Sequence, residues 1–278
     1  MSTLIRDAHE ASTWDEEVDV LVVGLGAAGA AAGLEASAQG ANTLILERAS
    51  GGGGTSAMSG GVIYLGGGTA LQHACGFEDS DEEMFKYLMA SCGDAPDEAK
   101  MQIYCEGSVA HYDWLCAQGV PFKNTYYHGT SGEPPTDDGL VWSGAEQAHP
   151  FCELARPAPR GHVPQIEHQG GPLLMRKLCE AVDASPARLA TDHRCVALYQ
   201  TTDGEILGAA VEAFGEQRSI RAKGGVILTT GGFVGAVDGD ELLNAVLPDV
   251  REVVEGGVPV ERCSPHWRGS GGMNGGGR

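Results

Sequence analysis

The first apolar run of the chain, residues 18–23 (VDVLVV), is interrupted only by Asp19. A short run of this kind predicts a strand buried in a parallel sheet. The alanine-rich segment over about residues 27–39 predicts a helix, which Gly40 ends because glycine readily adopts the left-handed backbone found just beyond a helix. The next run, residues 43–46 (TLIL), predicts a second parallel strand. This strand–helix–strand order predicts an α/β, Rossmann-like domain with a parallel sheet.

Helical periodicity follows in the middle of the chain. Ser80 and Glu83 have the spacing of a capping box, and Pro96 suits the first turn of the next helix. Gly107 separates that helix from another, which is expected to end at Gly119. A further helix is predicted to start at Gly170-Gly171-Pro172. The apolar positions expected to face the core are Met84, Tyr87, Leu88, Tyr112, Leu115, Leu174, Leu178 and Val182.

Residues 121–170 have no clear period and are rich in proline, glycine, histidine and aromatic residues, so we expect a long loop region. Three aromatic residues could shape an apolar pocket there: Trp142, Phe151 and Phe122. Acid–base or anion-binding roles are open for three ionisable residues, although the pattern favours solvated loop positions for them: His149, Arg160 and His162.

Between residues 188 and 222 the pattern changes to a period of two, which is typical of strands. It predicts a three-stranded β-meander with strands over 194–199, 206–214 and 218–221. The expected turns are Asp203-Gly204 and Gly215. Val226–Leu228 is expected to be the next buried parallel strand.

The loop after the first strand carries Gly24-x-Gly26-x-x-Gly29, the pattern of a dinucleotide site. Gly24 permits a tight turn, Gly26 lets a pyrophosphate approach the backbone, and Gly29 lets helix and strand pack closely. The amides at the helix start, including those of Ala27 and Ala28, would bind the phosphates. Glu47 follows the second strand and would accept a hydrogen bond from a ribose hydroxyl, which disfavours NADP because its carboxylate would repel a 2′-phosphate.

Arg48 and a glycine-rich segment follow this acid, and nine of the eighteen residues from 51 to 68 are glycine. Bare backbone with hydroxyl groups between the glycines can lie along a long, anionic ligand such as FAD. A flexible linker is disfavoured because several residues are too apolar for solvated coil: Met58, Val62, Ile63, Tyr64 and Leu65.

The motifs VVGLGAAGAAAG, LILERASGGGGTSAMSGGVIYLGGGT, PAPRGHVPQ and GGVILTTGGF resemble the flavoproteins of the fumarate reductase/succinate dehydrogenase type. Within these the chain is most similar to the 3-ketosteroid dehydrogenase branch, and SGGVIYLGGGT with PAPRGHVPQ resembles its 3-oxo-5α-steroid 4-dehydrogenases. The resemblance covers about residues 16–234.

The resemblance implies an FAD-binding domain with an inserted β-meander. The cofactor-binding residues predicted from the motifs and the resemblance together are Gly24, Gly26, Ala27, Ala28, Gly29, Glu47, Arg48, Gly53, Gly54, Thr55, Ser56, Ser59, Gly60, Gly61, Cys195, Thr230 and Gly231. Cys195 would meet the adenine through its backbone. Related fumarate and succinate enzymes often tether the flavin through a loop histidine, whose place is taken here by Gly54, so we expect non-covalent FAD.

The resemblance further implies an oxidoreductase acting on CH–CH groups, which desaturates a 3-ketosteroid ring by hydride transfer to flavin N5. Two alternatives stay open. One is a truncated or frameshifted flavin-binding fragment without catalysis, because the tyrosines that such dehydrogenases use lie outside this sequence. The other is a fumarate-reductase-like alkene reductase, which the few arginines between residues 100 and 170 disfavour.

We therefore expect an N-terminal extension (1–17), an FAD-binding domain (18–235) that is incomplete at its C-terminus, and an unmatched, disordered tail (236–278). The net charge of −20 over 278 residues argues against nucleic acid and against anionic membranes as partners. No apolar run is long enough to span a membrane, no cysteine spacing suggests a metal site, and the eight cysteines are expected to be reduced in a cytoplasmic protein. The exact substrate, the catalytic residues and the oligomeric state are left open.

Overall fold

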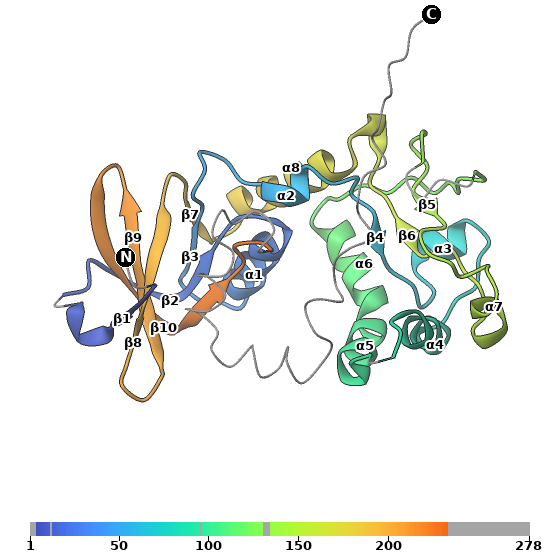
Figure 1. Cartoon of the computed structure of the whole chain (residues 1–278). Helices are drawn as coiled ribbons and strands as arrows, with labels where there is room; N and C mark the ends of the chain where they lie inside the picture. Colours follow the sequence, from blue (N-terminus) through green and yellow to red (C-terminus); the bar gives the residue numbers. More distant parts are fainter. Residues whose placement is uncertain (1–3, 12, 95, 130–133, 233–278) are drawn as a thin grey trace, which may run out of the picture.

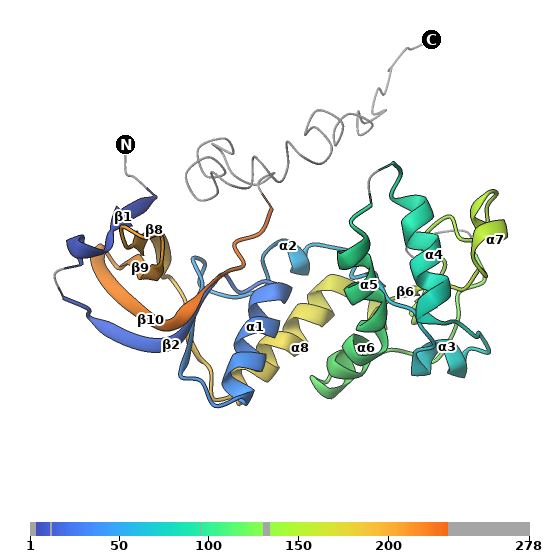
Figure 2. The ribbon, with the colours of Figure 1, turned by 90° about the horizontal axis from the view of Figure 1, so that it is seen from below.

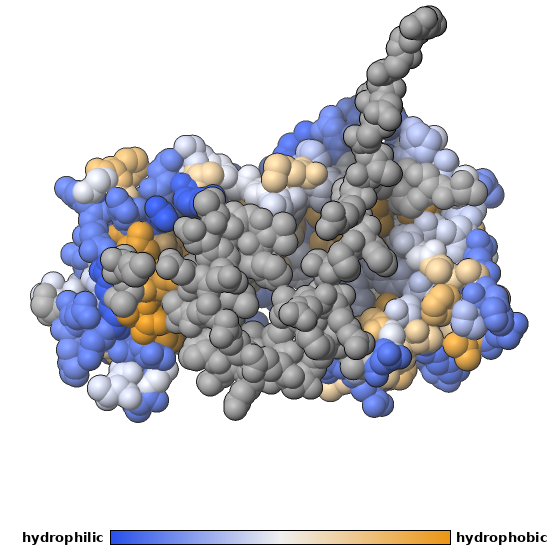
Figure 3. Space-filling model, in the orientation of Figure 1, coloured by the Kyte–Doolittle hydropathy of each residue, from blue (hydrophilic) through white to orange (hydrophobic). Residues whose placement is uncertain are grey.

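The computed structural model describes residues 4–11, 13–94, 96–129 and 134–232, so the tail predicted for residues 236–278 lies outside the described residues. Figure 1 shows two parts. One contains a large sheet with helices α1 (Ala27–Ala38) and α8 (Gly170–Ala184), and the other is mainly helical. In Figure 3 most of the coloured surface is hydrophilic, in keeping with 38 acidic residues, and an apolar group lies over strands β8 and β9.

The large sheet has seven strands in the order β1-β8-β9-β10-β2-β3-β7. Their bounds are β1 Ile5–Asp7, β2 Glu16–Val23, β3 Thr43–Leu46, β7 Arg188–Ala190, β8 Arg194–Gln200, β9 Ile206–Ala213 and β10 Glu216–Leu228. Strands β10, β2, β3 and β7 pair in parallel, whereas β8, β9 and β10 form an antiparallel meander. The predicted α/β class with a mainly parallel sheet and an inserted meander is confirmed.

The apolar strands β2 and β3 are buried on both faces, which explains their unbroken hydrophobic pattern. Val22 and Ile45 face α1 and α8, while Leu21 and Leu44 face the meander. Gly33 on α1 lies so close to β3 that a Cβ there would be 2.3 Å from Ile45 Cδ1. Figure 2 shows α1 and α8 side by side next to strands β2 and β10.

The N-terminal residues, expected to be an extension, contribute to this sheet. Strand β1 pairs in parallel with β8, and the 3₁₀ helix η1 (Ala8–Glu10) follows it with Asp7 as its cap. Asp15 then joins the edge of the meander, because its carboxylate accepts a hydrogen bond from the amide of Ser219 at 2.7 Å.

Strand β10 differs from the prediction. The segments 218–221 and 226–228, expected to be separate strands, form one strand with an irregularity between Ala222 and Gly225. Its first half pairs with β9 and its second half with β2. The prediction that Val226–Leu228 is buried is wrong, because Ile227 and Leu228 are exposed and no described strand covers their other edge.

The helical part contains α3 (Ala70–Ala74), α4 (Asp81–Ser91), α5 (Glu98–Glu106) and α6 (Ser108–Ala117). Ser80 caps α4, but the side chain of Glu83 binds Lys86 and the amide of Arg156, so the predicted reciprocal capping box is not formed. Pro96 is not in the first turn of α5, since Asp97 is the cap and the helix begins one residue later. The predicted break at Gly107 and the start of α8 at Gly170 are confirmed.

The region 121–170, expected to be loop-like, contains secondary structure. Strands β5 (Leu140–Val141) and β6 (Gly161–His162) join β4 (Ile63–Tyr64) in a three-stranded sheet, and α7 (Phe151–Leu154) and η2 (Ile166–His168) lie nearby in sequence. The three aromatic residues do not form one pocket. Their rings pack separately: Phe122 against Tyr112, Trp142 against Phe77 and Phe151 against Tyr87.

Candidate functional site

The first glycine turn joins the carboxyl end of β2 to α1. Gly24 has a φ of +105°, and its amide donates a hydrogen bond to the carbonyl of Leu46 at 2.7 Å. A Cβ on Gly29 would lie 1.9 Å from the carbonyl oxygen of Gly24, so only glycine permits this contact of helix and turn. The hydroxyl of Thr229 shares its hydrogen between the carbonyls of Val23 and Gly24, at 2.8 and 2.9 Å.

The N-terminus of α1 leaves backbone donors free. Gly26 is the cap and has no side chain to bind the first turn, while the Ala27 amide donates to Ser56 Oγ at 3.3 Å. Within the described part of the chain, the amides of Ala28 and Gly29 have no hydrogen-bond partner. A Cβ on Gly26 would meet only Ser56 Oγ, at 3.5 Å. The result is an accessible backbone with free N–H groups at the positive end of a helix, which favours an anion.

Glu47 follows β3 and fixes the shape of this turn. Its Oε2 accepts a hydrogen bond from the Leu25 amide and its Oε1 one from the Ala49 amide, both at 2.8 Å. A carboxylate has further acceptor positions, so Glu47 can hold the loop and still accept a ligand hydroxyl. Arg48 beside it is exposed.

The glycine run beyond Arg48 folds back onto the first turn. Gly53 has a φ of +127° and donates to the carbonyl of Leu25 at 2.7 Å, and the short helix α2 (Gly54–Ala57) follows. Thr55 and Gly54 are exposed on it, and a Cβ on Gly54 would have no neighbour among the described residues. Met58, one of the residues considered too apolar for solvated coil, is 79% exposed, whereas Leu65 is fully buried.

The last two glycines of this run have a packing role that the sequence did not reveal. A Cβ on Gly61 would lie 2.5 Å from the backbone of Gly170, and one on Gly171 would lie 2.3 Å from the carbonyl of Ser59. Gly60 and Gly61 therefore let the loop touch the first turn of α8 through bare backbone. The paired glycines Gly170 and Gly171 are the sequence signal from which this contact could have been predicted.

A second glycine run, Gly66–Gly68, follows strand β4 in the helical part. Its amides donate to buried polar side chains: Gly66 to Ser108 Oγ at 2.8 Å, Gly67 to Asp79 Oδ2 at 3.2 Å, and Gly68 to Gln72 Oε1 at 3.0 Å. These donors are satisfied by the protein itself.

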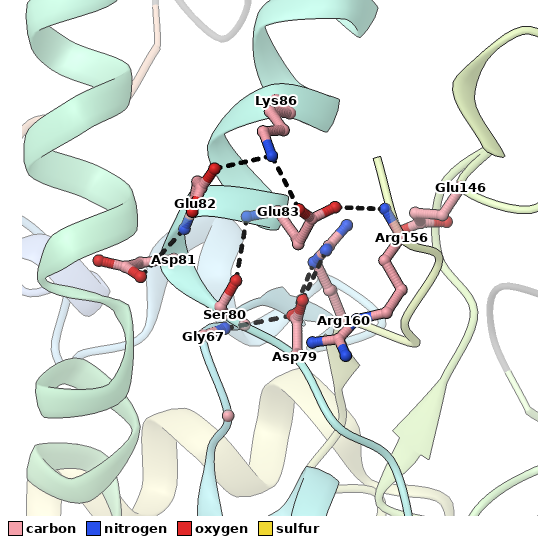
Figure 4. A network of polar contacts seen from close by, with 12 residues as sticks. Gly67, Asp79, Ser80, Asp81, Glu82, Glu83, Lys86, Glu146, Arg156 and Arg160 are labelled. Carbon is pink, nitrogen blue, oxygen red and sulfur yellow. Dashed lines mark hydrogen bonds and ion pairs between the residues drawn. The ribbon is translucent and has the colours of Figure 1, made fainter. Parts of the chain in front are cut away.

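Arg160 secures that arrangement. Its Nε and Nη2 donate to the two carboxylate oxygens of Asp79 at 2.8 and 2.7 Å, and both side chains are fully buried. Figure 4 shows this pair beside Gly67. The solvated position favoured for Arg160 is therefore wrong, because a partner far away in the sequence neutralises its charge.

His162 is also buried, contrary to the prediction, whereas His149 is exposed as expected. The Nδ1 of His162 donates to the carbonyl of Arg160 at 3.0 Å, so the Nε2 of His162 accepts from the hydroxyl of Thr69 at 2.7 Å. Burial lowers the pKa of His162 to about 4, which keeps the ring neutral.

Most predicted cofactor-binding residues come together at the carboxyl ends of β2, β3 and β10. They are Gly24, Gly26, Ala27, Ala28, Gly29, Glu47, Arg48, Gly53, Gly54, Thr55, Ser56, Ser59, Gly60 and Gly61, with Thr230 and Gly231 next to Thr229. Cys195 lies at the start of β8, two residues after His193, whose amide donates to the carbonyl of Glu47 at 2.9 Å. The sequence missed Thr229, Gly170 and Gly171.

The arrangement fits FAD. A pyrophosphate needs free amides and a close approach to the backbone, which the start of α1 offers, and a ribose needs an acceptor, which Glu47 supplies. In the described ranges no group of three or more histidine, cysteine, aspartate or glutamate side chains could hold a metal ion. The seven cysteines that the structure describes are free thiols. Among the described helices, none combines the length and apolarity needed to cross a membrane.

Comparison with known proteins gives consistent results. The family described as an FAD binding domain matches residues 19–254, which extends past residue 234, where the resemblance was expected to end, into the segment expected to be unmatched. The chain is 33% identical to 3-oxo-5-alpha-steroid 4-dehydrogenase of Comamonas testosteroni, over 76% of this chain and 40% of that protein.

Solved structures agree. The 3-ketosteroid-delta4-(5alpha)-dehydrogenase of Rhodococcus jostii RHA1, in complex with 4-androstene-3,17-dione, is 46% identical with a TM-score of 0.80, over 87% of this chain and 51% of that chain. A flavocytochrome c3 fumarate reductase in an open conformation is 29% identical with a TM-score of 0.66, over 81% and 35%. This chain thus spans about half or less of the length of these relatives.

Proposed function

The chain belongs to the FAD binding domain family, and from this premise we propose that it binds FAD non-covalently and carries the cofactor site of a 3-ketosteroid ring dehydrogenase. The single observation that carries the proposal is the start of α1, where Gly26 leaves the backbone open and the amides of Ala28 and Gly29 have no partner among the described residues. The steroid as substrate is supported by the similarity to two dehydrogenases whose names specify 3-ketosteroids.

Each part of the site has a separate task in this proposal. The free amides at the start of α1 bind the pyrophosphate, and Glu47 accepts a hydrogen bond from the ribose. Thr55 and Ser56 on α2 offer hydroxyl groups, and that of Ser56 lies beside the start of α1, while Gly60 and Gly61 hold this loop against α8. Bound FAD supplies the two-electron acceptor that dehydrogenation of a CH–CH bond requires. We assign no residue of this chain as the base that removes the proton.

Non-covalent binding follows from the residue types in the loop. Residues 48–61 contain no histidine, and Gly54 occupies the place at which related enzymes attach the flavin. The cytoplasmic location belongs to the same proposal, and the acidic composition and the free thiols of the described cysteines support it.

The experiment first records the absorption spectrum of bound FAD and then measures activity. Purified protein is saturated with FAD, and reduction of an artificial electron acceptor is measured with a 3-oxo-5α-steroid as substrate. Steroid-dependent dye reduction supports the proposal. Bound FAD without any turnover would instead support the second candidate, a flavin-binding unit without catalysis of its own.

The alkene-reductase alternative receives little support from the described arginines in the relevant region. Arg160 is fully buried and committed to Asp79, and Arg156 lies 3.5 Å from Glu78. Neither gives the arginine cluster that would hold a dicarboxylate. Oxidation of a reduced dye by fumarate, at a rate above that with the steroid, would overturn this preference.

A further inference from the structure

Phe214 combines two unfavourable features. It occupies the two-residue turn between β9 and β10 with Gly215, and the flanking residues Ala213 and Glu216 pair directly. Both turn residues have left-handed backbone, with φ of +53° at Phe214 and +83° at Gly215. Asparagine or glycine normally fills the first position of such a turn, because a bulky residue is strained there. Phe214 is also 84% exposed.

Strain and exposure do not coincide at the other large exposed apolar residues. Ile103 on α5 and Leu154 on α7 have ordinary helical backbone. An exposed aromatic ring in a strained turn destabilises the fold in two ways, because the backbone is strained and the apolar surface is not buried. Outliers of this kind point to a function that needs the side chain at that place.

Phe214 is linked to the part of the proposed site that contains Glu47. The Phe214 ring meets the ring of His193 edge to face, with centroids 5.9 Å apart. His193 is itself fixed, because its amide donates to the carbonyl of Glu47 at 2.9 Å and its Nδ1 binds the carbonyl of Thr191 at 2.6 Å. Across the meander, Cys195 on β8 pairs with Val211 on β9. Phe214 is thus connected through one side chain to the residue proposed to bind the ribose.

We propose that Phe214, held in place by His193, forms an aromatic wall against the adenine ring of FAD. An adenine offers a flat π-face to an aromatic ring, and such contacts contribute to affinity without specific hydrogen bonds. The proposal rests on the FAD site proposed above and adds to it a side-chain contact for the adenine. It also explains why phenylalanine occupies a turn position that suits asparagine.

The test is the variant Phe214→Asn, because asparagine tolerates the left-handed turn and lacks the ring. We expect its thermal unfolding to match or exceed that of the wild type, and its dissociation constants for FAD and for ADP to rise about 10-fold. FMN lacks the adenine, so its binding should not change. Phe214→Tyr keeps the ring and should bind FAD like the wild type. Ile103→Asn removes another exposed apolar side chain, on α5 outside the site, and serves as the control.

Three outcomes would overturn this assignment. Equal affinity of the wild type and Phe214→Asn for both FAD and ADP removes the adenine contact but leaves the proposed FAD site intact. Equal weakening of FAD and FMN shows a general disturbance of the site. A folded wild type that binds neither FAD nor ADP defeats the FAD site itself, and this proposal with it.

Discussion

Two glycine-rich runs of this chain differ in what their backbone amides bind. The first is Gly24–Gly29 at the start of α1, where the amides of Ala28 and Gly29 have no partner within the described residues. At the second, the amides of Gly66–Gly68 donate to Ser108, Asp79 and Gln72. Glycine enrichment therefore does not by itself identify a ligand site. The partners of the amides distinguish a ligand cradle from an internally satisfied loop.

The largest effect on stability is expected from removing the side-chain partners of the second run, Gly66–Gly68. Asp79→Ala leaves the buried guanidinium of Arg160 without its partner, and it removes the acceptor of the Gly67 amide. We expect the free energy of unfolding to fall by about 3–5 kcal/mol, measured by urea denaturation. Glu78→Ala, which removes the neighbouring exposed partner of Arg156, should cost less than about 1 kcal/mol. Similar losses in both variants would contradict a buried pair that holds the second run.

His162 should make the same region sensitive to acid. Its folded pKa of about 4 lies below the ordinary value of 6.5, so the unfolded chain takes up the proton first as the pH falls. Its contribution is fully present above pH 6.5 and is lost between pH 6.5 and about 4, by roughly 3 kcal/mol in total. His162→Gln cannot titrate, so its unfolding free energy should fall less over this range in urea melts. Parallel pH curves for both proteins would disprove the neutral, buried histidine.

The first run can be tested with two glycines that have different surroundings. Gly29→Ala would place a Cβ 1.9 Å from the Gly24 carbonyl and should destabilise the fold by about 1–3 kcal/mol. Gly26→Ala meets only Ser56 Oγ at 3.5 Å, so it should leave the melting temperature nearly unchanged and weaken FAD binding. Calorimetry measures both quantities. A Gly26→Ala protein with undiminished FAD affinity would speak against pyrophosphate at the start of α1.

The smallest effect is expected at the contact between α2 and α1. Ser56→Ala removes the acceptor of the Ala27 amide and should lower the unfolding free energy by about 1 kcal/mol. Thr55→Ala on the same short helix has an exposed side chain and is the matched control. A loss no greater than that of the control in thermal melts would show that this hydrogen bond adds nothing to stability.

Local signals in the sequence were sufficient for the cofactor half of the fold. The strand at 43–46 and the helix that starts at Ala27 were predicted from periodicity and glycine, and both turns of the meander were found from Asp203-Gly204 and Gly215. These signals act within a few residues, so a single sequence contains them.

The errors concern contacts made over long distances. Arg160 is buried because Asp79 neutralises its charge. The residues around Arg160 in the sequence contain no signal for a partner eighty-one positions away. The continuous strand β10 depends on β9 and β2 together, and its apolar end at Ile227 is exposed because β2 pairs with one edge there and no described strand covers the other. Gly170 and Gly171 were recognised only as the start of a helix, whereas their contact with the loop needed the fold.

Titration of the flavin-free, folded protein with FAD tests the central claim most directly, with far-UV circular dichroism recorded on the same sample. We expect saturable uptake of one FAD per chain, with a flavin spectrum that acid precipitation releases completely into the supernatant. A folded protein that takes up no FAD at a large excess, or a precipitate that retains the yellow colour, would contradict a non-covalent flavin held by bare backbone.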